Sequence, residues 1–303
     1  MSVRLLALRS LAAASGVVAD RALGEPPLRP HPVSAFGTAM RAVEARLYAD
    51  CRARGAVHAV VGLGLGLGAG RAIGSTAVAT YVAVAGRALG EAATTVATAL
   101  DAGDLEAARR LLPGLVGREP AGLDAGEVAR AVVESLADNT VDAVVAPVLW
   151  AAVAGAPGAL GYRAVNTLDA MVGHRSDRYH RYGWASARLD DLAGWAPARV
   201  TAVLVAGARP SAAGAVWRAV RHEAPAHPSP NAGVAEAAFA AALGVRLGGT
   251  NCYGGRTERR ASVGTGPAAG GDDIGRAVRL SADVGALLAA TLAGGAVVTG
   301  RWQ

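Results

Sequence analysis

The stretch "AVVAPVLWAAVAGAPGALGY", from Ala143 to Tyr162, contains no charged residue. A helix needs about 20 predominantly apolar residues to cross the hydrocarbon core of a bilayer, and this stretch is long enough. The whole chain of 303 residues is 52% hydrophobic and only 18% charged, with a mean hydropathy of +0.30. Because a soluble enzyme of this length usually carries more charge, these values predict a membrane protein.

Further segments of the chain also suit membrane helices. Residues 56–85 contain a single charge, Arg71, and fit either one tilted helix or two helices with a turn near Arg71. Together the predicted spans lie near residues 5–19, 56–85, 143–162, 200–217 and 282–299. We therefore expect an all-α fold, a polytopic integral membrane helix bundle with long, polar, partly irregular connecting loops, which forms a single domain over residues 1–303. Arginines occur in every connecting stretch, so the positive-inside rule does not orient the chain.

The sequence "VGLGLGLGAG", from Val61 to Gly70, resembles a nucleotide-binding loop only superficially. A phosphate-binding loop ends in Gly-Lys-Ser or Gly-Lys-Thr, and this chain contains no lysine. Small residues that repeat inside an apolar span are typical of close helix packing. We interpret this stretch as a packing face.

The net charge of +6 comes from arginines that are spread along the chain. This distribution argues against a nucleic-acid partner, whose binding site would need a basic patch. Anionic lipid headgroups and anionic substrates remain compatible partners. The two cysteines, Cys51 and Cys252, are too few and too far apart to predict a disulfide framework or a zinc site.

Three carboxylates precede the apolar stretch at a spacing of four residues. Glu134, Asp138 and Asp142 would lie along one face of a helix, where like charges repel one another. Arg130, one turn upstream of Glu134, is the nearest cation in the local sequence. A bound cation explains such a row better than the helix dipole does, and carboxylate oxygens suit Mg²⁺. An arginine on a partner helix is the alternative.

Three other polar segments interrupt the apolar sequence. Residues 19–37, "ADRALGEPPLRPHPVSAFG", and the Pro-rich start of residues 227–255, "HPSPNAGVAEAAFAAALGVRLGGTNCYGG", predict shaped loops. Residues 166–199, "NTLDAMVGHRSDRYHRYGWASARLDDLAGWAPAR", mix aspartates with arginines, whose planar forks suit phosphate or carboxylate groups. A rigid connector for the first segment and a membrane-surface helix for residues 166–199 are the simpler interpretations.

These segments resemble the adenosylcobinamide-phosphate synthase family of cobalamin biosynthesis proteins. The resemblance rests on "DRALGEPPLRPHPV", on "ESLADNTVDAVVAP" and on the longer motifs that begin at Asn166 and His227, in the order in which the family has them from about Asp20 to Gly255. It implies a multi-pass enzyme of the cell membrane, here the bacterial inner membrane. Such an enzyme joins the propionate carboxylate of adenosylcobyric acid to the amine of aminopropanol or its phosphate ester, with ATP and Mg²⁺. Other corrin-pathway enzymes are possible partners.

Given that chemistry, we assign expected roles to individual residues. Glu134, Asp138 and Asp142 are the expected metal ligands. Asp190 or Asp191 is the expected general base for the attacking ammonium, and the expected catalytic set is Asp190, Asp191, His227 and Asn231. The expected substrate-binding residues are His31, Asn139, Arg175, Arg178, Arg188 and Asn251.

Two other classes of protein compete with the ligase. Acids beside an apolar span and the broken apolar segment at Arg209-Pro210 are also features of transporters. No inverted repeat is visible in the sequence, and much polar sequence lies outside the spans. A non-catalytic scaffold for corrin-pathway enzymes is the third class, although four polar motifs exceed what a scaffold requires.

Overall fold

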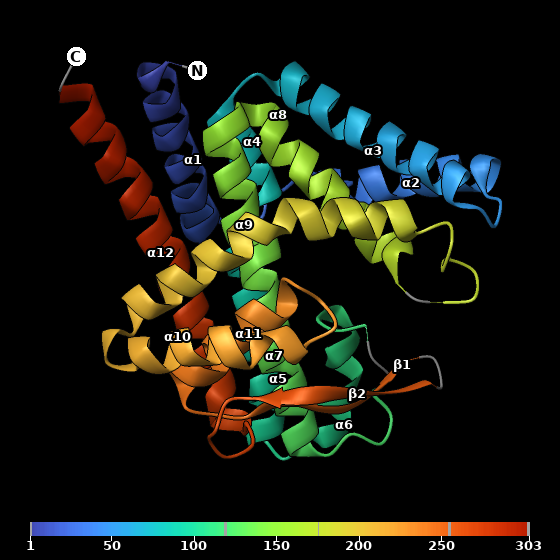
Figure 1. Cartoon of the computed structure of the whole chain (residues 1–303), viewed down its shortest axis with the longest axis vertical. Helices are drawn as coiled ribbons and strands as arrows, with labels where there is room; N and C mark the ends of the chain where they lie inside the picture. Colours follow the sequence, from blue (N-terminus) through green and yellow to red (C-terminus); the bar gives the residue numbers. More distant parts are fainter. Residues whose placement is uncertain (1, 118–119, 175, 254–255, 302–303) are drawn as a thin grey trace. The chain divides into compact units, whose positions relative to one another are not determined.

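The computed structural model of the chain describes residues 2–117, 120–174, 176–253 and 256–301 (Figure 1). Helices form most of this part, and a single two-stranded hairpin is its only sheet. The prediction of an all-α membrane fold without a substantial sheet is confirmed. The chain divides into two compact units, residues 1–85, 142–197 and 288–303 in the first and residues 86–141 and 198–287 in the second. The single-domain assignment stays a prediction.

The first half of the chain is helical up to the end of the long apolar stretch. Its α-helices are α1 (Val3–Leu23), α2 (Pro32–Leu47), α3 (Arg52–Ile73), α4 (Thr76–Ala83), α5 (Gly86–Asp101), α6 (Leu105–Leu111), α7 (Ala125–Thr140) and α8 (Ala146–Leu168). Short helical turns accompany them, namely the 3-10 turn η1 (Leu112–Gly114) and the π-helical turns η2 (Val141–Val145) and η3 (Asp169–Gly173).

The second half adds the hairpin and the last helices. These elements are α9 (Trp184–Ala208), η4 (Pro210–Ala212), α10 (Ala213–His222), η5 (Ala224–Ala226), α11 (Ala232–Leu243), β1 (Leu247–Tyr253), β2 (Arg256–Val263) and α12 (Gly271–Arg301).

Three helical segments in the described part are long and apolar enough to cross a membrane: Arg52–Ile73, Ala125–Gly173 and Gly271–Val298. They include most of the predicted spans near 56–85, 143–162 and 282–299. The predicted span 200–217 falls on a pair of helices, Trp184–Ala208 and Pro210–Ala226, which is bent by 112° and counts as a fourth span if the pair is one. Residues 5–19 form part of α1, which is not among these candidates. Residues 56–85 are broken at Gly74 and Ser75, as the two-helix alternative predicted.

The helical run Ala125–Gly173 is too long to be one straight span. Its 49 residues would extend about 74 Å at a rise of 1.5 Å per residue, whereas the hydrocarbon core is about 30 Å thick. The run departs from regular α-helix at the π-helical turns η2 and η3 and at Gly155, whose φ of +70° is not helical. Such π-helical turns inside helices are frequent at functional sites.

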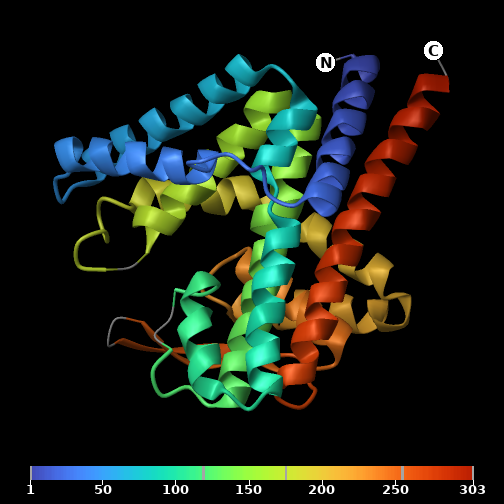
Figure 2. The same cartoon turned by 180° about the vertical axis from the view of Figure 1, so that it is seen from behind.

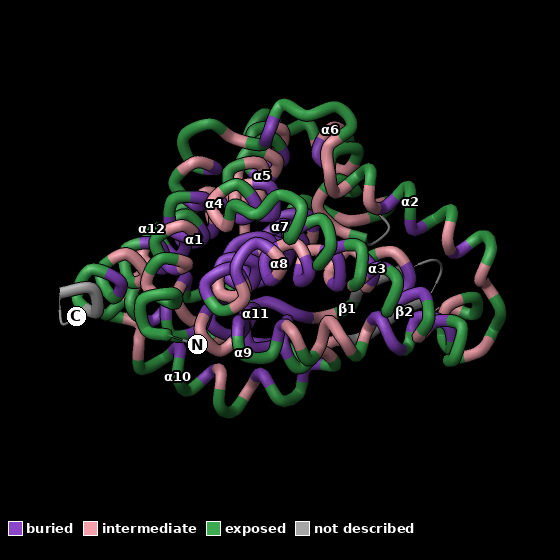
Figure 3. Tube along the Cα trace, turned by 90° about the horizontal axis from the view of Figure 1, so that it is seen from above, coloured by how far each residue is buried: buried purple, intermediate pink, exposed green. Residues whose placement is uncertain are grey.

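The first unit is built around α8, which contacts α1, α3 and α4 and is mostly buried (Figures 1 and 3). Small residues make the approach of α3 possible. A Cβ atom added at Gly66 would lie 2.6 Å from the Cβ of Ala164, and one added at Gly70 would lie 2.5 Å from the carbonyl oxygen of Ala156. The glycine-rich stretch is therefore a helix-packing face, as the sequence predicted.

The second unit is built around α7, which lies against α5, α6 and α11 (Figure 2). A capping box starts α7: the Asp124 side chain accepts a hydrogen bond from the Glu127 N–H, and the Glu127 side chain accepts one from the Asp124 N–H. The remainder of α7 is buried on nearly every side from Val128 to Ala137. Helix α11 is likewise buried along most of its length, although it contains Glu236.

The antiparallel hairpin of β1 and β2 belongs to the second unit. Its register is irregular between Leu247 and Gly249, where Gly248 and Gly249 have φ values of +85° and +107°. A Cβ atom at Gly248 would collide with the backbone of Ala261 on the opposite strand. This position therefore requires glycine, and the irregular backbone directs the N–H of Gly248 away from the ladder.

Candidate functional site

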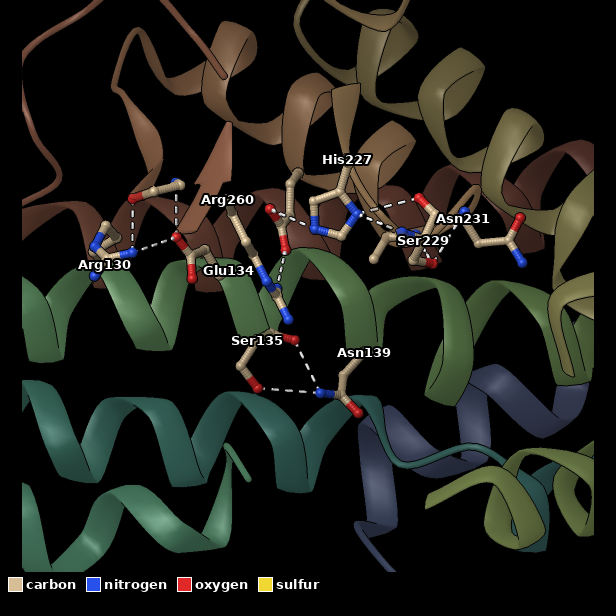
Figure 4. Close-up of polar contacts among 11 residues, drawn as sticks. Arg130, Glu134, Ser135, Asn139, His227, Ser229, Asn231 and Arg260 are labelled. Carbon is tan, nitrogen blue, oxygen red and sulfur yellow. Dashed lines mark hydrogen bonds and ion pairs between the residues drawn. The ribbon is translucent and has the colours of Figure 1, made fainter. Parts of the chain in front are cut away.

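A polar cavity of about 150 Å³ lies inside the second unit. Its lining residues come from helix α7, the segment after η1, helix α11 and strand β2. Figure 4 shows the polar contacts of several of these residues. The lining of the cavity consists of Leu115, Val116, Gly117, Glu134, Ser135, Asp138, Asn139, Glu236 and Arg260. The cavity thus gathers three carboxylates, one guanidinium, one hydroxyl and one carboxamide, and we take it as the candidate site.

Helix α7 contributes four polar residues to the lining of this cavity, namely Glu134, Ser135, Asp138 and Asn139. The carboxamide nitrogen of Asn139 donates to the carbonyl oxygen of Ser135 at 3.0 Å and to its hydroxyl oxygen at 3.1 Å. The Ser135 hydroxyl in turn donates to the carbonyl oxygen of Leu115 at 2.7 Å. These bonds fix the orientation of Asn139, so that its carboxamide oxygen is left to accept a further hydrogen bond. Asn139, which the sequence predicts to bind substrate, lines this cavity. Its substrate-binding role stays a prediction.

Glu134 connects α7 to the hairpin. Its side chain is only 2% exposed, and its Oε1 accepts from the N–H of Gly248 at 2.8 Å and from Arg130 at 3.2 Å. Arg130 also donates to the carbonyl oxygens of Gly248, at 2.7 Å, and Thr250, at 3.1 Å. Arg130 therefore offsets the charge of Glu134, as its position one turn upstream suggested, and the pair holds β1 against the helix.

His227, Glu236 and Arg260 form a second polar group, of which Glu236 and Arg260 line the cavity. The Oε2 atom of Glu236 lies 3.7 Å from His227 Nε2, and its Oε1 lies 3.6 Å from an Arg260 guanidinium nitrogen. The backbone N–H of Ser229 donates to His227 Nδ1 at 3.0 Å. With Nδ1 as the acceptor, the neutral ring carries its proton on Nε2, directed toward Glu236; the other tautomer carries it on Nδ1 and makes Nε2 the proton acceptor. The Ser229 carbonyl oxygen, 3.2 Å from Nδ1, would accept instead if that nitrogen carried a proton.

Asn231 stands at the start of α11 and not in the lining of the cavity. Its Oδ1 accepts from Arg199 at 3.1 Å. The Ser229 hydroxyl accepts from the N–H groups of Asn231 and Ala232 at 3.3 and 3.2 Å, and so caps the helix start. The Pro-rich loop before α11 is therefore shaped by His227 and Ser229, and the catalytic role expected of Asn231 stays a prediction.

The first unit holds a separate group of polar residues around Asp142. The Tyr162 hydroxyl donates to one oxygen of Asp142 and the carboxamide of Asn166 to the other, each at 2.9 Å. The same Asn166 nitrogen lies 3.4 Å from an oxygen of Asp190. Asp142 belongs to the π-helical turn η2, and Asp169, which interacts electrostatically with it, begins the π-helical turn η3. Both π-helical turns thus bring acids to one cluster.

The remaining predicted residues are scattered. In the first unit, Asp191 lies 3.7 Å from the exposed Arg188. His31 caps α2 by accepting from the N–H of Val33 at 3.4 Å. Arg175 lies outside the described residues, as does the side chain of Asn251, whose backbone belongs to β1 of the second unit.

Arg178 contacts other residues of the first unit. It donates to Glu44 at 3.1 Å and stacks 4.0 Å from the centre of the Tyr48 ring. Hydrogen bonding to Glu44 raises the pKa of the Arg178 guanidinium above its ordinary value. The substrate-binding roles of Arg178, Arg188, His31, Arg175 and Asn251 stay predictions.

The three proposed metal ligands have different surroundings. Glu134 already accepts two hydrogen bonds, Asp138 lines the cavity, and Asp142 belongs to the first unit. Within the described ranges, no group of three His, Cys, Asp or Glu side chains is close enough to hold a metal ion. The residues present therefore do not form a ready magnesium site, and the metal assignment stays a prediction.

Sequence reasoning missed several residues of both groups. Arg260 was overlooked because nothing in its sequence neighbourhood distinguishes it from the other arginines. Glu236 carried a usable signal, since a lone acid in an Ala-rich apolar helix must find a partner. Tyr162 and Asn166 follow Asp142 by 20 and 24 residues, and the break in α8 at Gly155, which lies between them and Asp142, allows the chain to bring them back to it.

A helical membrane protein with a small, acid-rich cavity is the class that this fold and site define. The family described as "CobD/Cbib protein" matches residues 13–281. The chain belongs to this family of cobalamin biosynthesis proteins, which confirms the resemblance inferred from its motifs. The match begins before Asp20 and extends into α12, beyond the end of the motifs at Gly255.

Curated relatives agree with this assignment. "Cobalamin biosynthesis protein CobD" of Mycobacterium tuberculosis is 48% identical over 287 residues, which cover 90% of this chain and 91% of the relative. The proteins of the same name from Geobacter metallireducens and Halalkalibacterium halodurans are 42% and 38% identical, with 82% and 86% of this chain and 85% and 88% of each relative covered. No solved structure matches the chain.

Proposed function

We propose that this protein is an amide ligase of cobalamin biosynthesis in the bacterial inner membrane. Its reaction would join a propionate carboxylate of adenosylcobyric acid to the amine of aminopropanol or of its phosphate ester. Family membership over residues 13–281 is the observation that supports the proposal most strongly. The cavity with its His227–Glu236 pair adds chemistry that a purely structural membrane protein does not need.

Amide formation requires an activated carboxylate, since hydroxide is a poor leaving group. In the proposed reaction, ATP transfers its terminal phosphoryl group to the carboxylate, giving an acyl phosphate and ADP. The neutral amine then attacks the acyl carbon and the C–N bond forms. The acyl C–O bond breaks, and phosphate leaves with the electron pair of that bond. One proton from the amine passes to a base. Mg²⁺ would accompany ATP, because it is commonly held by phosphate oxygens and one or two carboxylates; we assign no residue to it.

The proton of the attacking amine needs an acceptor close to the amine. In the second unit, the pair of His227 and Glu236 has the right composition, since an imidazole beside a carboxylate is a common proton acceptor. In the first unit, Asp190 and Asp191 retain their proposed role as the alternative base. His227→Gln would remove the imidazole of the His227–Glu236 pair, and a loss of amide formation in this variant would support that pair as the base. A loss of amide formation in Asp190→Asn would support the aspartates.

The apolar exterior of the proposed enzyme suits its large substrate. Leucine and valine side chains of α1 and α3 are exposed, which is expected of surfaces in contact with lipid. A corrin is amphipathic, and an enzyme in the membrane can meet it at the bilayer interface. Transport and scaffolding remain the rival classes.

Omission assays on the purified, detergent-solubilised protein test the proposal. Adenosylcobyric acid, aminopropanol or its phosphate ester, ATP and Mg²⁺ are combined, and the amide is sought by mass spectrometry, with each component left out in turn. An amide that depends on every component supports the ligase. Corrin binding without amide would favour a scaffold, and corrin flux into liposomes would favour a transporter.

A further inference from the structure

The cavity of the second unit is too small for a corrin or a nucleotide. Pockets for drug-sized ligands usually have volumes of about 300–1,000 Å³, whereas this one has about 150 Å³. At about 30 Å³ for each water-sized group, such a space holds on the order of five heavy atoms. This inference rests on the proposed function. Of the two substrates that the ligase would join, the smaller one, the amine, is the one that suits this cavity.

The charges around the cavity select the type of compound. The carboxylates of Glu134, Asp138 and Glu236 line it, together with the guanidinium of Arg260. Outside the lining, Arg130 pairs with Glu134 and His227 lies 3.7 Å from Glu236. Asp138 and Glu236 come from two different helices, α7 and α11, that face the same space. Because an ammonium group donates three hydrogen bonds and carboxylates accept them, this lining is complementary to a small cation.

The uncharged groups supply the second half of a recognition site. The oxygen of the Asn139 carboxamide accepts hydrogen bonds, since the nitrogen of that group is already used on Ser135. It can therefore receive the hydroxyl of an amino alcohol. Arg260, on β2, lies at the same cavity and offers donors to an oxygen or a phosphate.

We propose that this cavity binds the amine substrate, a short amino alcohol in its ammonium form, with the cation held by Asp138 and Glu236. Asp138 then recognises the amine, which differs from the magnesium role that the sequence suggested for it. The carboxylate of Glu134 belongs to the anchor of the hairpin and only borders the site. The same ammonium is present in the free amino alcohol and in its phosphate ester, so the cavity recognises the amine end of both, and the added phosphate of the ester would extend beyond it.

Direct binding tests the proposal without catalysis. Labelled 1-aminopropan-2-ol is added to the purified whole protein in detergent, with neither corrin nor ATP, and bound ligand is measured by equilibrium dialysis. Propylamine, which keeps the ammonium, is expected to displace the label, whereas propane-1,2-diol, which lacks it, is not. Displacement by the diol but not by the amine would overturn the proposal, and this comparison needs no variant.

A variant pair locates the site. Asp138→Asn is nearly isosteric and is expected to weaken binding of the amino alcohol by about tenfold or more, because a hydrogen bond to a charged group is lost. Binding of the phosphate ester should weaken by a similar factor. The control is Glu91→Gln, an exposed acid of α5 paired only with the exposed Arg87 in the described part, which should change nothing. Equal binding by wild type and Asp138→Asn, with matching thermal melts, would overturn the proposal.

The outcomes separate this proposal from the proposed reaction. Amino alcohol binding that depends on Asp138, without any amide in the full assay, would sustain the amine site and reject the ligase. Amide formation whose KM for the amine is unchanged in Asp138→Asn would sustain the ligase and reject this site. A rise in the Mg²⁺ requirement of Asp138→Asn, with an unchanged KM for the amine, would likewise reject it in favour of a metal ligand.

Discussion

Gly248 donates its backbone N–H to the carboxylate of Glu134 at 2.8 Å, across 114 residues of sequence. Arg130 contacts both residues, so that a helix and a hairpin are joined by one buried group of hydrogen bonds. The sequence predicts a metal ligand at Glu134, and that role stays a prediction; the observed contacts are those of an anchor between helix and hairpin. A buried carboxylate that accepts a backbone N–H and a guanidinium is satisfied without an added cation.

Replacement of Glu134 separates these two roles. Glu134→Ala would remove the carboxylate that offsets the charge of the buried Arg130 and accepts from Gly248, and we expect the protein to lose about 3 kcal/mol of stability. Glu134→Gln keeps an oxygen that accepts from Gly248 and should retain much more of it. Chemical denaturation in detergent measures both variants.

The dependence of activity on Mg²⁺ is the accompanying readout. If Glu134 is an anchor, Glu134→Gln should show the wild-type dependence on Mg²⁺ concentration. A large rise in the required Mg²⁺ would contradict the anchor and restore the metal role.

Glycines on α3 offer a sharper test of the helix packing. At Gly66, an added methyl group would meet Ala164 and the backbone of Leu160, at 2.6 and 2.7 Å. Gly66→Ala should therefore destabilise the protein by about 1–3 kcal/mol, as overpacking does. The matched control is Gly68→Ala, where nothing lies within 4 Å of the added atom. Thermal melts in one detergent compare them; equal melting temperatures would contradict the packing.

Asn166 should be intolerant of a negative charge. Its carboxamide nitrogen lies between the carboxylates of Asp142 and Asp190, at 2.9 and 3.4 Å. Asn166→Asp replaces this donor by an acceptor with a like charge, so we expect at least tenfold less amide product and a lower melting temperature. The neighbouring Thr167→Val, which loses only a bond to the Arg163 carbonyl, is the control. Wild-type stability and activity in Asn166→Asp would show that this cluster is not constrained as described.

The buried hydroxyl of Tyr182 leads us to predict that the folded protein loses stability at alkaline pH. Burial raises the pKa of the Tyr182 hydroxyl to about 12 in the folded protein, against about 10 in an unfolded chain. The folded state then holds the proton more tightly, so this contribution to stability is complete below pH 10 and is lost as the pH rises toward 12. The hydroxyl is buried and has no hydrogen-bond partner in the described part.

The variant Tyr182→Phe isolates that contribution. It should match the wild type or exceed it in stability at pH 7, and its melting temperature should fall less between pH 10 and 12. Tyr81→Phe, on α4, is the control that should keep the wild-type alkaline loss. An unchanged pH profile in Tyr182→Phe would exclude this residue as the cause.

The sequence predicted the fold class well because membrane helices are long and their apolar composition is a local property. It also located the break near Gly74 as one of two alternatives, and the packing face at Val61–Gly70. It did not predict that α7 and α8 form one interrupted run, because the π-helical turn at Val141–Val145 that joins them has no simple sequence signature. Residues 5–19, which the sequence predicted as a span, form part of α1, and α1 is not among the helices that are long and apolar enough to cross a membrane.

For the site, spacing found the acids but not their partners. Equal spacing of four residues predicted that Glu134, Asp138 and Asp142 share a face, and the π-helical turn at Val141–Val145 breaks that regular progression. Arg260 and Gly248 reach the site only through the hairpin, a contact between distant parts of the chain. Such long-range contacts depend on tertiary structure, which the pattern of one sequence does not contain.

Isotope transfer tests the central claim most directly. Adenosylcobyric acid labelled with oxygen-18 in its free carboxylate is incubated with the protein, ATP, Mg²⁺ and aminopropanol, and both the amide and the released phosphate are analysed by mass spectrometry. The account predicts an amide and one labelled oxygen in each phosphate released, because the acyl C–O bond breaks when the amine attacks. Amide with unlabelled phosphate would contradict activation through an acyl phosphate, and no amide at all would contradict the ligase.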